Sequence, residues 1–474
     1  MKVITMTTED QTTNRRQFLK TLGLTAAALP FAAQCASARR SGRSPRKPRN
    51  VVFILSDDHR YDFMSFLNKP KFLETPNMDR MAREGAYVKN ATVSTALCSP
   101  SRASILTGQY AHKHGVVDNN TLVPKGTRFF PQDLQEAGWQ TAFMGKWHMG
   151  GSTDAPRPGF HKWISFRGQG VYFDPTFNID GKRVKREGHV SDLLTDYALD
   201  WLKNDRDQDK PFFLYLSHKA VHAMFEPAKR HLGKYENVKL EYPKSMAYTK
   251  ENYKGKPDWV KEQRNSWHGV DHMYHGQMDF DTFYRRYCET LLSVDESIGR
   301  VIKYLEDNNL AEDTLVIYMG DNGFVFGEHG LIDKRHMYEE SMRVPFLIRW
   351  PGRIKARHDN LLLSAPDICP TLLDLMGFES DIPPETDGIS HAPLFLTGKG
   401  KRPTSQLYMW VPVGEPAWGR RGDRTHRYAL MIDKKPGKPT EQTLHDNISD
   451  PYQLENICLL YTSPSPRDLS TSRM

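Results

Sequence analysis

Val51-Val52-Phe53-Ile54-Leu55-Ser56-Asp57-Asp58-His59 (VVFILSDDH, 51–59) joins five apolar residues to a pair of carboxylates. An apolar run of this length is typical of a strand buried on both faces of a parallel sheet. The aspartates follow where such a strand would leave the sheet. Two aspartates after a strand most often form a turn or cap a helix, so this stretch alone predicts a buried strand rather than a site.

The same pattern occurs three more times along the chain. Residues 314–318 lead to Asp321 and Asn322, residues 141–144 lead to Lys146 and His148, and residues 212–216 lead to His218 and His222. Helical stretches at 190–203 and 283–307 separate these runs, which predicts a largely parallel sheet covered on both faces. Because ligand sites in such sheets lie beyond the carboxyl ends of the strands, we expect the four polar clusters to meet in one crevice.

The composition suits one large α/β domain with a smaller one appended. The chain has 474 residues, of which 38% are hydrophobic and 26% charged, and its formal net charge is +8. No apolar stretch of about 20 residues follows the first 40 positions, so no membrane span is indicated in the body of the chain. The positive charges favour anionic partners, but they are dispersed and no nucleic-acid motif accompanies them, which argues against nucleic-acid binding.

The first 38 residues have the features of a twin-arginine export signal. Arg15 and Arg16 precede an apolar run over residues 22–33, and small residues at 36–38 offer a cleavage site. We therefore expect an exported protein, periplasmic or secreted, that uses the twin-arginine machinery. Cys35 leaves a lipid anchor open. Residues 39–49 are a basic, proline-containing linker that cannot form a core.

The other end of the chain loses the apolar pattern of a folded domain. Residues 444–457 carry apolar and turn residues consistent with a final sheet, whereas residues 458–474 resemble translated adapter sequence. We hypothesise that 458–474 is a non-native tail. A genomic reading frame that continues without interruption through Met474 would refute this hypothesis.

Cys98 opens the segment CSPSRASILTG. Ser99 can cap a helix there, Pro100 suits its first turn, and Gly108 can end it. The cysteine would then meet a helix N-terminus, which favours an anion, either a thiolate or a bound sulfate. A single cysteine is more often a buried structural residue. Here the combined C-x-P-x-R spacing with Arg102 argues against that reading, because chance rarely produces it.

With C-x-P-S-R, LSDDH, GKWHMG and GDNGFVFGEHGLIDKRHMYEESMRVPFLIRWPG, the chain resembles the sulfatase family of the alkaline-phosphatase superfamily over residues 50–457. The resemblance implies an alkaline-phosphatase-like α/β fold, with a catalytic domain over 50–376 and a smaller C-terminal α+β subdomain over 377–457. It also implies sulfate-ester hydrolysis. Cys98 would be oxidised to formylglycine by a maturation enzyme that recognises Pro100 and Arg102.

The resemblance also implies a calcium site and a set of catalytic residues. Carboxylates dominate calcium shells, and the positions that match the family's calcium ligands are Asp57, Asp58, Asp321 and Asn322. The implied roles of the other residues follow the chemistry of sulfate esters. The hydrated aldehyde of residue 98 would attack sulfur, and Arg102 and Lys146 would stabilise this nucleophile while Asp321 takes its proton. His222 and Lys334 would hold the sulfate group and assist the leaving oxygen. His148 would accept the proton whose removal releases sulfate.

Two histidine assignments have competitors. The family often has proline around the motif histidine, whereas this chain has Val221 and Met224, so His218 is the rival of His222. We favour His222 on the spacing SHKAVH. His329 in GEHG lines the pocket or caps a loop.

Residues 224–285 are rich in lysine and aromatic residues, among them Trp259, Trp267, His268, His272 and His275. Aromatic faces stack on sugars and lysines meet sulfate groups, so a sulfated carbohydrate is the favoured substrate, although any one of these residues is as readily a solvated loop residue. After a helix over 366–376 that Gly377 can end, segments 405–411 and 428–432 predict a small antiparallel sheet.

Two other functions remain open at this point. Phosphonate or phosphate monoester hydrolases of the same superfamily need similar clamps for a tetrahedral anion. A non-catalytic protein that binds sulfated glycans would keep the pocket without turnover.

Overall fold

The computed structural model describes residues 49–410 and 418–458. The predicted export signal, the basic linker up to residue 48 and the proposed tail from residue 459 lie outside the described residues. In the part of the chain that is described, no helix has the length and apolar character needed to cross a bilayer.

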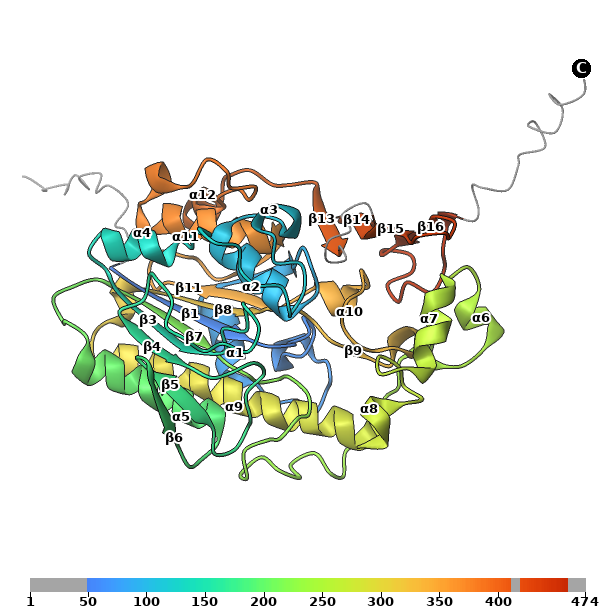
Figure 1. Ribbon diagram of the computed structural model, residues 1–474, viewed down its shortest axis with the longest axis horizontal. Helices are drawn as coiled ribbons and strands as arrows, with labels where there is room; N and C mark the ends of the chain where they lie inside the picture. Colours follow the sequence, from blue (N-terminus) through green and yellow to red (C-terminus); the bar gives the residue numbers. More distant parts are fainter. Residues whose placement is uncertain (1–48, 411–417, 459–474) are drawn as a thin grey trace, which may run out of the picture. The chain divides into compact units, whose positions relative to one another are not determined.

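A ten-stranded sheet forms the centre of the fold, in the order β12-β2-β11-β8-β1-β7-β3-β4-β5-β6 (Figure 1). Its strands are β1 (Asn50–Ser56), β2 (Ala86–Thr92), β3 (Gln140–Gly145), β4 (Lys162–Ser165), β5 (Thr176–Ile179), β6 (Lys182–Lys185), β7 (Phe212–Ser217), β8 (Thr314–Gly320), β11 (Phe346–Arg349) and β12 (Arg357–Ser364). The five neighbouring strands β8, β1, β7, β3 and β4 are all parallel to one another. Strand β11 is antiparallel to both of its neighbours, β2 and β8. The predicted mostly parallel sheet is therefore confirmed.

Helices cover both faces of this sheet, and the pattern of β1 explains why. Val51, Phe53 and Leu55 belong to one core cluster, whereas Val52 and Ile54 belong to the other. Because side chains alternate along a strand, a strand covered on both faces must be apolar at every position. The first face is covered by α2 (Cys98–Thr107), α4 (Pro131–Glu136), α11 (Ile368–Met376) and α12 (Ala392–Thr397), and the second by α1 (Pro76–Glu84), α5 (Val190–Asp200) and α9 (Phe280–Asp307) (Figure 1).

The remaining elements lie beyond the large sheet or connect its strands. They are α3 (Ala111–His114), α6 (Lys250–Tyr253), α7 (Asp258–Glu262), α8 (Met273–Gly276), α10 (Glu339–Met342), and the short pair β9 (Val325–Phe326) and β10 (Ile332–Asp333). A second sheet follows near the end of the chain, formed by β13 (Ser405–Trp410), β14 (Gly419–Thr425), β15 (Tyr428–Lys434) and β16 (Glu441–Asp446). It is antiparallel throughout, as predicted.

The start of α2 differs from the sequence prediction. The helix begins at Cys98, and its N-cap residue is Leu97, which makes no side-chain cap. Ser99 is therefore not the cap, and its hydroxyl instead donates to the backbone carbonyl of His148. Gly108 ends the helix with φ of 71°, as predicted, because glycine adopts this left-handed conformation without strain.

Candidate active site

The carboxyl ends of β1 and β8 place two acidic clusters side by side. The two strands are parallel neighbours with Ser56 opposite Gly320, so Asp57 and Asp58 leave the sheet next to Asp321. All three carboxylates are buried. The backbone N–H of Asp58 donates to Oδ1 of Asp321 at 3.1 Å. The convergence that the strand ends predict is thus present.

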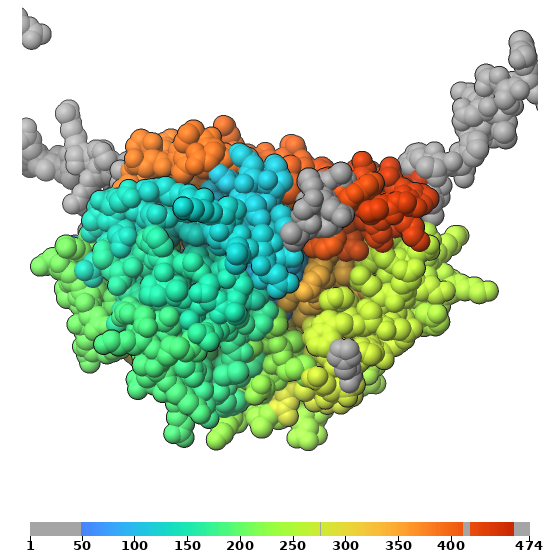
Figure 2. All heavy atoms as spheres, in the orientation of Figure 1, coloured from blue at the N-terminus to red at the C-terminus, as the bar shows by residue number. Residues whose placement is uncertain are grey.

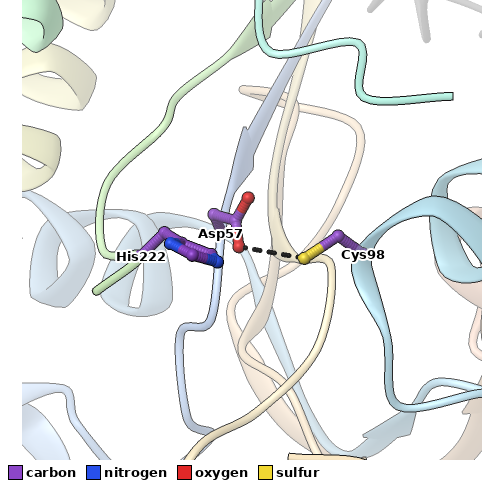
Figure 3. Close-up of side chains that lie close together, drawn as sticks. All are labelled: Asp57, Cys98 and His222. Atoms are coloured by element: carbon purple, nitrogen blue, oxygen red, sulfur yellow. Dashed lines mark hydrogen bonds between the residues drawn. The ribbon is translucent and has the colours of Figure 1, made fainter. Parts of the chain in front are cut away.

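Cys98 faces this acidic cluster from the first turn of α2. Its Sγ lies 3.4 Å from Oδ1 of Asp57, and Figure 3 shows the two side chains pointing toward one another, with His222 on the other side of Asp57. The helix follows β2, whose direction matches that of β8, so the cysteine reaches the same edge of the sheet. Burial and the neighbouring Asp57 carboxylate raise the pKa of the Cys98 thiol well above its usual value. The helix N-terminus therefore does not produce a thiolate here.

Two cations lie beside Cys98 and the carboxylates. Arg102, one helical turn after Cys98, donates from Nε to Asp321 at 2.9 Å and from Nη2 to Asp57 at 3.2 Å. The Lys146 ammonium, at the end of β3, contacts Asp57 and lies 3.7 Å from Sγ of Cys98. Burial alone would raise the pKa of Asp57, but the positive charges of Lys146 and Arg102 hold it well below its usual value. Asp57 is therefore ionised.

Lys334 and His222 approach the cluster from the side of Asp58. Nζ of Lys334 donates to both oxygens of Asp58 at 2.6 Å each, and Nε2 of His222 lies 4.0 Å from Oδ2 of the same residue. Burial and the positive charges of Lys334 and Lys146 lower the pKa of His222 well below its usual value. The imidazole is neutral as a result, and it can accept a proton or donate a hydrogen bond.

His148 lies beside the start of α2, with Nδ1 3.5 Å from the Ser99 hydroxyl. Burial and the nearby Lys146 ammonium lower its pKa to about 2. The imidazole is therefore neutral. The family resemblance assigned to it the proton whose removal releases sulfate.

The two alternative histidines lie away from the acidic cluster. His218 is fully buried, and its Nε2 lies 3.0 Å from the hydroxyl of Ser297 on α9. The His329 ring is stacked on Tyr338, with 3.7 Å between the ring centroids. Among the histidines of the SHKAVH segment, the structure brings His222 rather than His218 to the site.

The acidic cluster has the donor set that a hard divalent cation requires. Ligand atoms of Asp57, Asp58, Asp321 and Cys98 all lie within 4.8 Å of one another. Burial, with smaller contributions from Asp57 and Asp321 and against the effect of Lys334, raises the pKa of Asp58 to about 8. Oδ1 of Asn322 is buried and accepts no hydrogen bond. Because buried amide oxygens are seldom left unpaired, these residues fit a calcium ion.

Four residues that the sequence did not indicate also belong to the site. Ser217 accepts a hydrogen bond from Nη1 of Arg102 at 2.7 Å, and Gln169 accepts one from the Lys146 ammonium. The Tyr172 hydroxyl donates to the carbonyl of His222 at 2.7 Å, and the Lys219 ammonium lies 4.3 Å from the centre of the Tyr172 ring. Ser217 and Lys219 follow a strand end, which was a usable signal. Gln169 and Tyr172 lie in an irregular loop without one.

The aromatic residues of segment 224–285 are divided between packing and exposed roles. Trp259 is only 3% exposed, because it is stacked on His336 and lies under the guanidinium of Arg420 at 3.9 Å. It therefore holds the fold together and does not offer a face to a sugar. Trp267 is 40% exposed and remains a candidate.

The same segment lies beside the small C-terminal sheet. Figure 2 shows the yellow-green residues of this segment next to the red residues of β14–β16. The N–H of Asp258 donates to Glu441 at 3.2 Å, and Asn456 donates to the carbonyl of Gly255 at 2.8 Å. His268 pairs with Asp333 at 2.8 Å, next to Lys334.

Two family models match the chain. The Sulfatase model matches residues 49–378, and the model described as N-sulphoglucosamine sulphohydrolase, C-terminal, matches residues 327–471. The first covers more than half of the chain, including every strand of the large sheet and all of the candidate site residues.

Characterised relatives and solved structures agree with this match. An N-acetylglucosamine-6-O-sulfatase of Bacteroides thetaiotaomicron is 33% identical, over 90% of this chain and 86% of that protein. A solved structure in complex with its substrate, D-glucosamine-2-N,6-O-disulfate, has a TM-score of 0.78 at 30% identity and covers 90% of this chain and 97% of that one. A phosphonate monoester hydrolase from Silicibacter pomeroyi shares the fold, with a TM-score of 0.72 at 22% identity over 89% of this chain and 92% of that one. The chain therefore belongs to the sulfatase family and is a sulfuric ester hydrolase.

Proposed function

We propose that the protein removes the 6-O-sulfate group from glucosamine residues of a sulfated glycan, with a formylglycine made from Cys98 and a bound calcium ion. The observation that carries the reaction is the position of Cys98 between buried carboxylates and buried cations. The sugar is supported by relatives named N-acetylglucosamine-6-sulfatases and by the neighbour that binds glucosamine disulfate.

Asp57, Asp58, Asp321 and Asn322 would hold the calcium ion. When bound, the ion supplies positive charge that polarises a sulfate oxygen and the nucleophile. The hydrate of formylglycine supplies one hydroxyl that is nucleophilic toward sulfur and a second whose ionisation releases sulfate.

The nucleophile's side of the site is formed by Arg102, Lys146 and Asp321. The two cations lie where negative charge develops on residue 98, and they are fixed in place by Asp57, Asp321 and Ser217 before substrate arrives. Such preorganised charges stabilise a transition state without reorganisation. Asp321, whose pKa burial and Asp57 raise, is placed to take the nucleophile's proton.

The leaving-group side is formed by Lys334 and His222. Both lie beside Asp58 and can hold the sulfate oxygens and the departing alkoxide. His148, which lies beside the start of α2, would accept the proton whose removal releases sulfate.

Maturation of Cys98 would take place before the protein is exported. A formylglycine-generating or sulfatase-maturating enzyme would act on Cys98 in the cytoplasm, before the twin-arginine machinery exports the folded protein to the periplasm or beyond. Pro100 and Arg102 would be the residues that the maturation enzyme reads.

Mass spectrometry of the Cys98 peptide, combined with a substrate panel, tests the proposal. We expect an aldehyde at residue 98 in protein from a maturation-competent host, and sulfate release from 6-O-sulfated N-acetylglucosamine but not from its 3-O- or 4-O-sulfated isomers. An unmodified thiol in active protein would refute the formylglycine, and preference for another isomer would refute the sugar assignment.

Kinetics on an aryl sulfate and on the matching aryl phosphate distinguish a sulfatase from a phosphonate or phosphate monoester hydrolase, the alternative that the shared fold raises. We expect the higher kcat/KM on the sulfate, because sulfate carries less negative charge and the site already holds three carboxylates. A higher kcat/KM on the phosphate would reverse the assignment.

A further inference from the structure

A surface pocket beside the catalytic machinery carries an arginine without a counter-ion. The pocket has a volume of about 450 Å³ and is lined by residues that include Val123, Lys125, Arg128, Phe129, Gln132 and Arg157. We refer to it as the Arg157 pocket. It contains three basic side chains and, among the described residues that line it, no acidic one.

Arg157 is unusual among the arginines of this protein. Its Nε and Nη2 atoms are buried and have no hydrogen-bond partner, and no carboxylate of the described residues forms an ion pair with it. Burial alone lowers the pKa of Arg157, with no acidic group acting against it. Because a partly buried guanidinium nearly always has acceptors, this one is suited to an anionic ligand. Nε and Nη2 are closed to solvent, so the ligand would approach the part of the guanidinium that lines the pocket.

The other two cations differ in how far they are already neutralised. Arg128 is neutralised by Asp133 and Glu136, both at 2.6 Å. Lys125 is exposed and forms no ion pair within the described part of the chain. Lys125 and Arg157 therefore leave a surplus of positive charge in the pocket.

Two contacts tie the pocket to the catalytic residues. A Cβ added to Gly150 would lie 3.3 Å from Nη2 of Arg157, and Gly150 is two residues after His148. His148 and Gly150 are separated by two Cα–Cα steps along the chain. These steps, added to the distance from Gly150 to Arg157, put the guanidinium within about 13 Å of the His148 Cα. The loop between α3 and α4, which forms the opposite wall, contains Asn119, which accepts a hydrogen bond from the N–H of Ser99 at 3.1 Å. Arg157 therefore lies within the length of a short oligosaccharide from His148.

We propose that the Arg157 pocket binds a second sulfo group of the substrate glycan, one that the enzyme does not remove. The inference rests on the proposed function, since it assumes that the substrate is a sulfated glycan. Guanidinium groups match the oxygens of such anions in geometry and charge. The pocket would favour oligosaccharides that carry two or more sulfo groups on neighbouring sugars over single sugars that carry one sulfo group.

Binding to the full-length Cys98→Ala protein tests the pocket without turnover. With a heparin hexasaccharide as probe, we expect Arg157→Gln to raise Kd about tenfold, the loss of one charge-assisted contact, and Arg157→Lys to recover most of the affinity. Arg186→Gln is the matched control, because Arg186 is exposed and contacts Tyr197 elsewhere on the molecule. An unchanged Kd in an Arg157→Gln variant that melts like its parent would overturn the proposal.

Two further probes identify the anion. A hyaluronan hexasaccharide carries carboxylates but no sulfo groups, and its weaker binding should not depend on Arg157. Equal dependence on Arg157 would overturn the sulfo assignment. Inorganic sulfate should compete only weakly, and competition as strong as that of the hexasaccharide would mean that the pocket takes free sulfate instead.

Turnover of a small aryl sulfate separates this proposal from the proposed function. With Cys98 intact, Arg157→Gln should hydrolyse the aryl sulfate at the native rate and lose efficiency only on the polysulfated chain. A native enzyme inactive on every sulfate ester would refute the proposed function, while the binding measurements would still decide whether the pocket exists.

Discussion

At the scale of single residues, the site depends on charges that neutralise one another within a buried cluster. Arg102 and Lys146 compensate Asp57, and Lys334 compensates Asp58. Removing one partner of a buried pair leaves an unpaired charge, which costs about 3–5 kcal/mol. A substitution of one of these charged residues would therefore lower both stability and activity, and the two effects could not be separated. Substitutions of neutral residues test the catalytic roles more directly.

The pair His222 and His218 provides such a test. We expect His222→Asn to lower kcat/KM about a hundredfold or more, with a larger loss on alkyl sulfates, whose leaving oxygen needs more assistance than that of aryl sulfates. His218→Asn is the matched control, because it loses only the hydrogen bond to Ser297. It should keep its kcat/KM and lose about 1 kcal/mol of unfolding free energy. Steady-state kinetics on both esters measure this, and equal losses in the two variants would contradict the assignment.

Cys98→Ser provides a second test at this scale, provided that mass spectrometry shows the serine unmodified. A serine has one hydroxyl, so after sulfo transfer it lacks the second hydroxyl whose ionisation would release sulfate. We expect at most slow turnover following a first stoichiometric release of the alcohol. Sustained turnover at the native rate would count against the proposed mechanism.

At the scale of elements, the ends of β1 and β8 bring three carboxylates together, and their repulsion is relieved by cations. A calcium ion between the two strand ends would stabilise the folded protein by about 2.7 kcal/mol at a concentration a hundred times its Kd. We expect Ca²⁺ to raise the melting temperature of the metal-free protein more than Mg²⁺ does, because Mg²⁺ gives up its water less readily.

Asn322→Leu tests the same site with no change in charge. The variant removes an Oδ1 that accepts no protein hydrogen bond, but it also removes the hydrogen bonds that Nδ2 donates to Asp58 and Gly323, so the melting temperature should fall with and without Ca²⁺. The readout is therefore the Ca²⁺-induced rise in melting temperature, which should become smaller. Differential scanning calorimetry after chelation and after Ca²⁺ addition measures this. A rise as large as that of the native protein would exclude Asn322 as a ligand.

At the scale of the whole molecule, one buried ion pair joins the large sheet's domain to the C-terminal sheet. Glu339 at the start of α10 accepts hydrogen bonds from Nε and Nη2 of Arg424 on β14, at 2.6 and 2.8 Å. Burial alone would raise the pKa of Glu339, but Arg424 and Arg343 lower it to about 2.

This pair predicts an acid-sensitive contact between the two sheets. The folded pKa lies below the usual value of about 4.3, so the stabilisation is present above about pH 4.3 and is lost as pH falls toward 2. Glu339→Gln should lower the unfolding free energy by roughly 3 kcal/mol at pH 7, with a shrinking difference below pH 4. Glu136→Gln is the control, because Glu136 is 66% exposed and its pair with Arg128 contributes little. Urea unfolding across this pH range measures both, and a difference independent of pH would contradict the prediction.

From the sequence alone, four strands of the large sheet, the sheet type and the four strand-end clusters could be predicted, because a strand covered on both faces must be apolar throughout and its polar residues can only begin where it leaves the sheet. Asp57, Asp321, Lys146 and His222 were all found in this way. The motif around Cys98 supplied the family.

Only the tertiary structure decided which polar residues meet, because that depends on strand order and on loops whose side chains follow no periodicity. It brought His222 to Asp58 and left His218 against α9, and it showed Trp259 to be buried under Arg420. It also placed Gln169 and Tyr172 in the site and Arg157 in a pocket without a counter-ion. These contacts join residues distant along the chain, and pairing across that distance is a property of the folded packing.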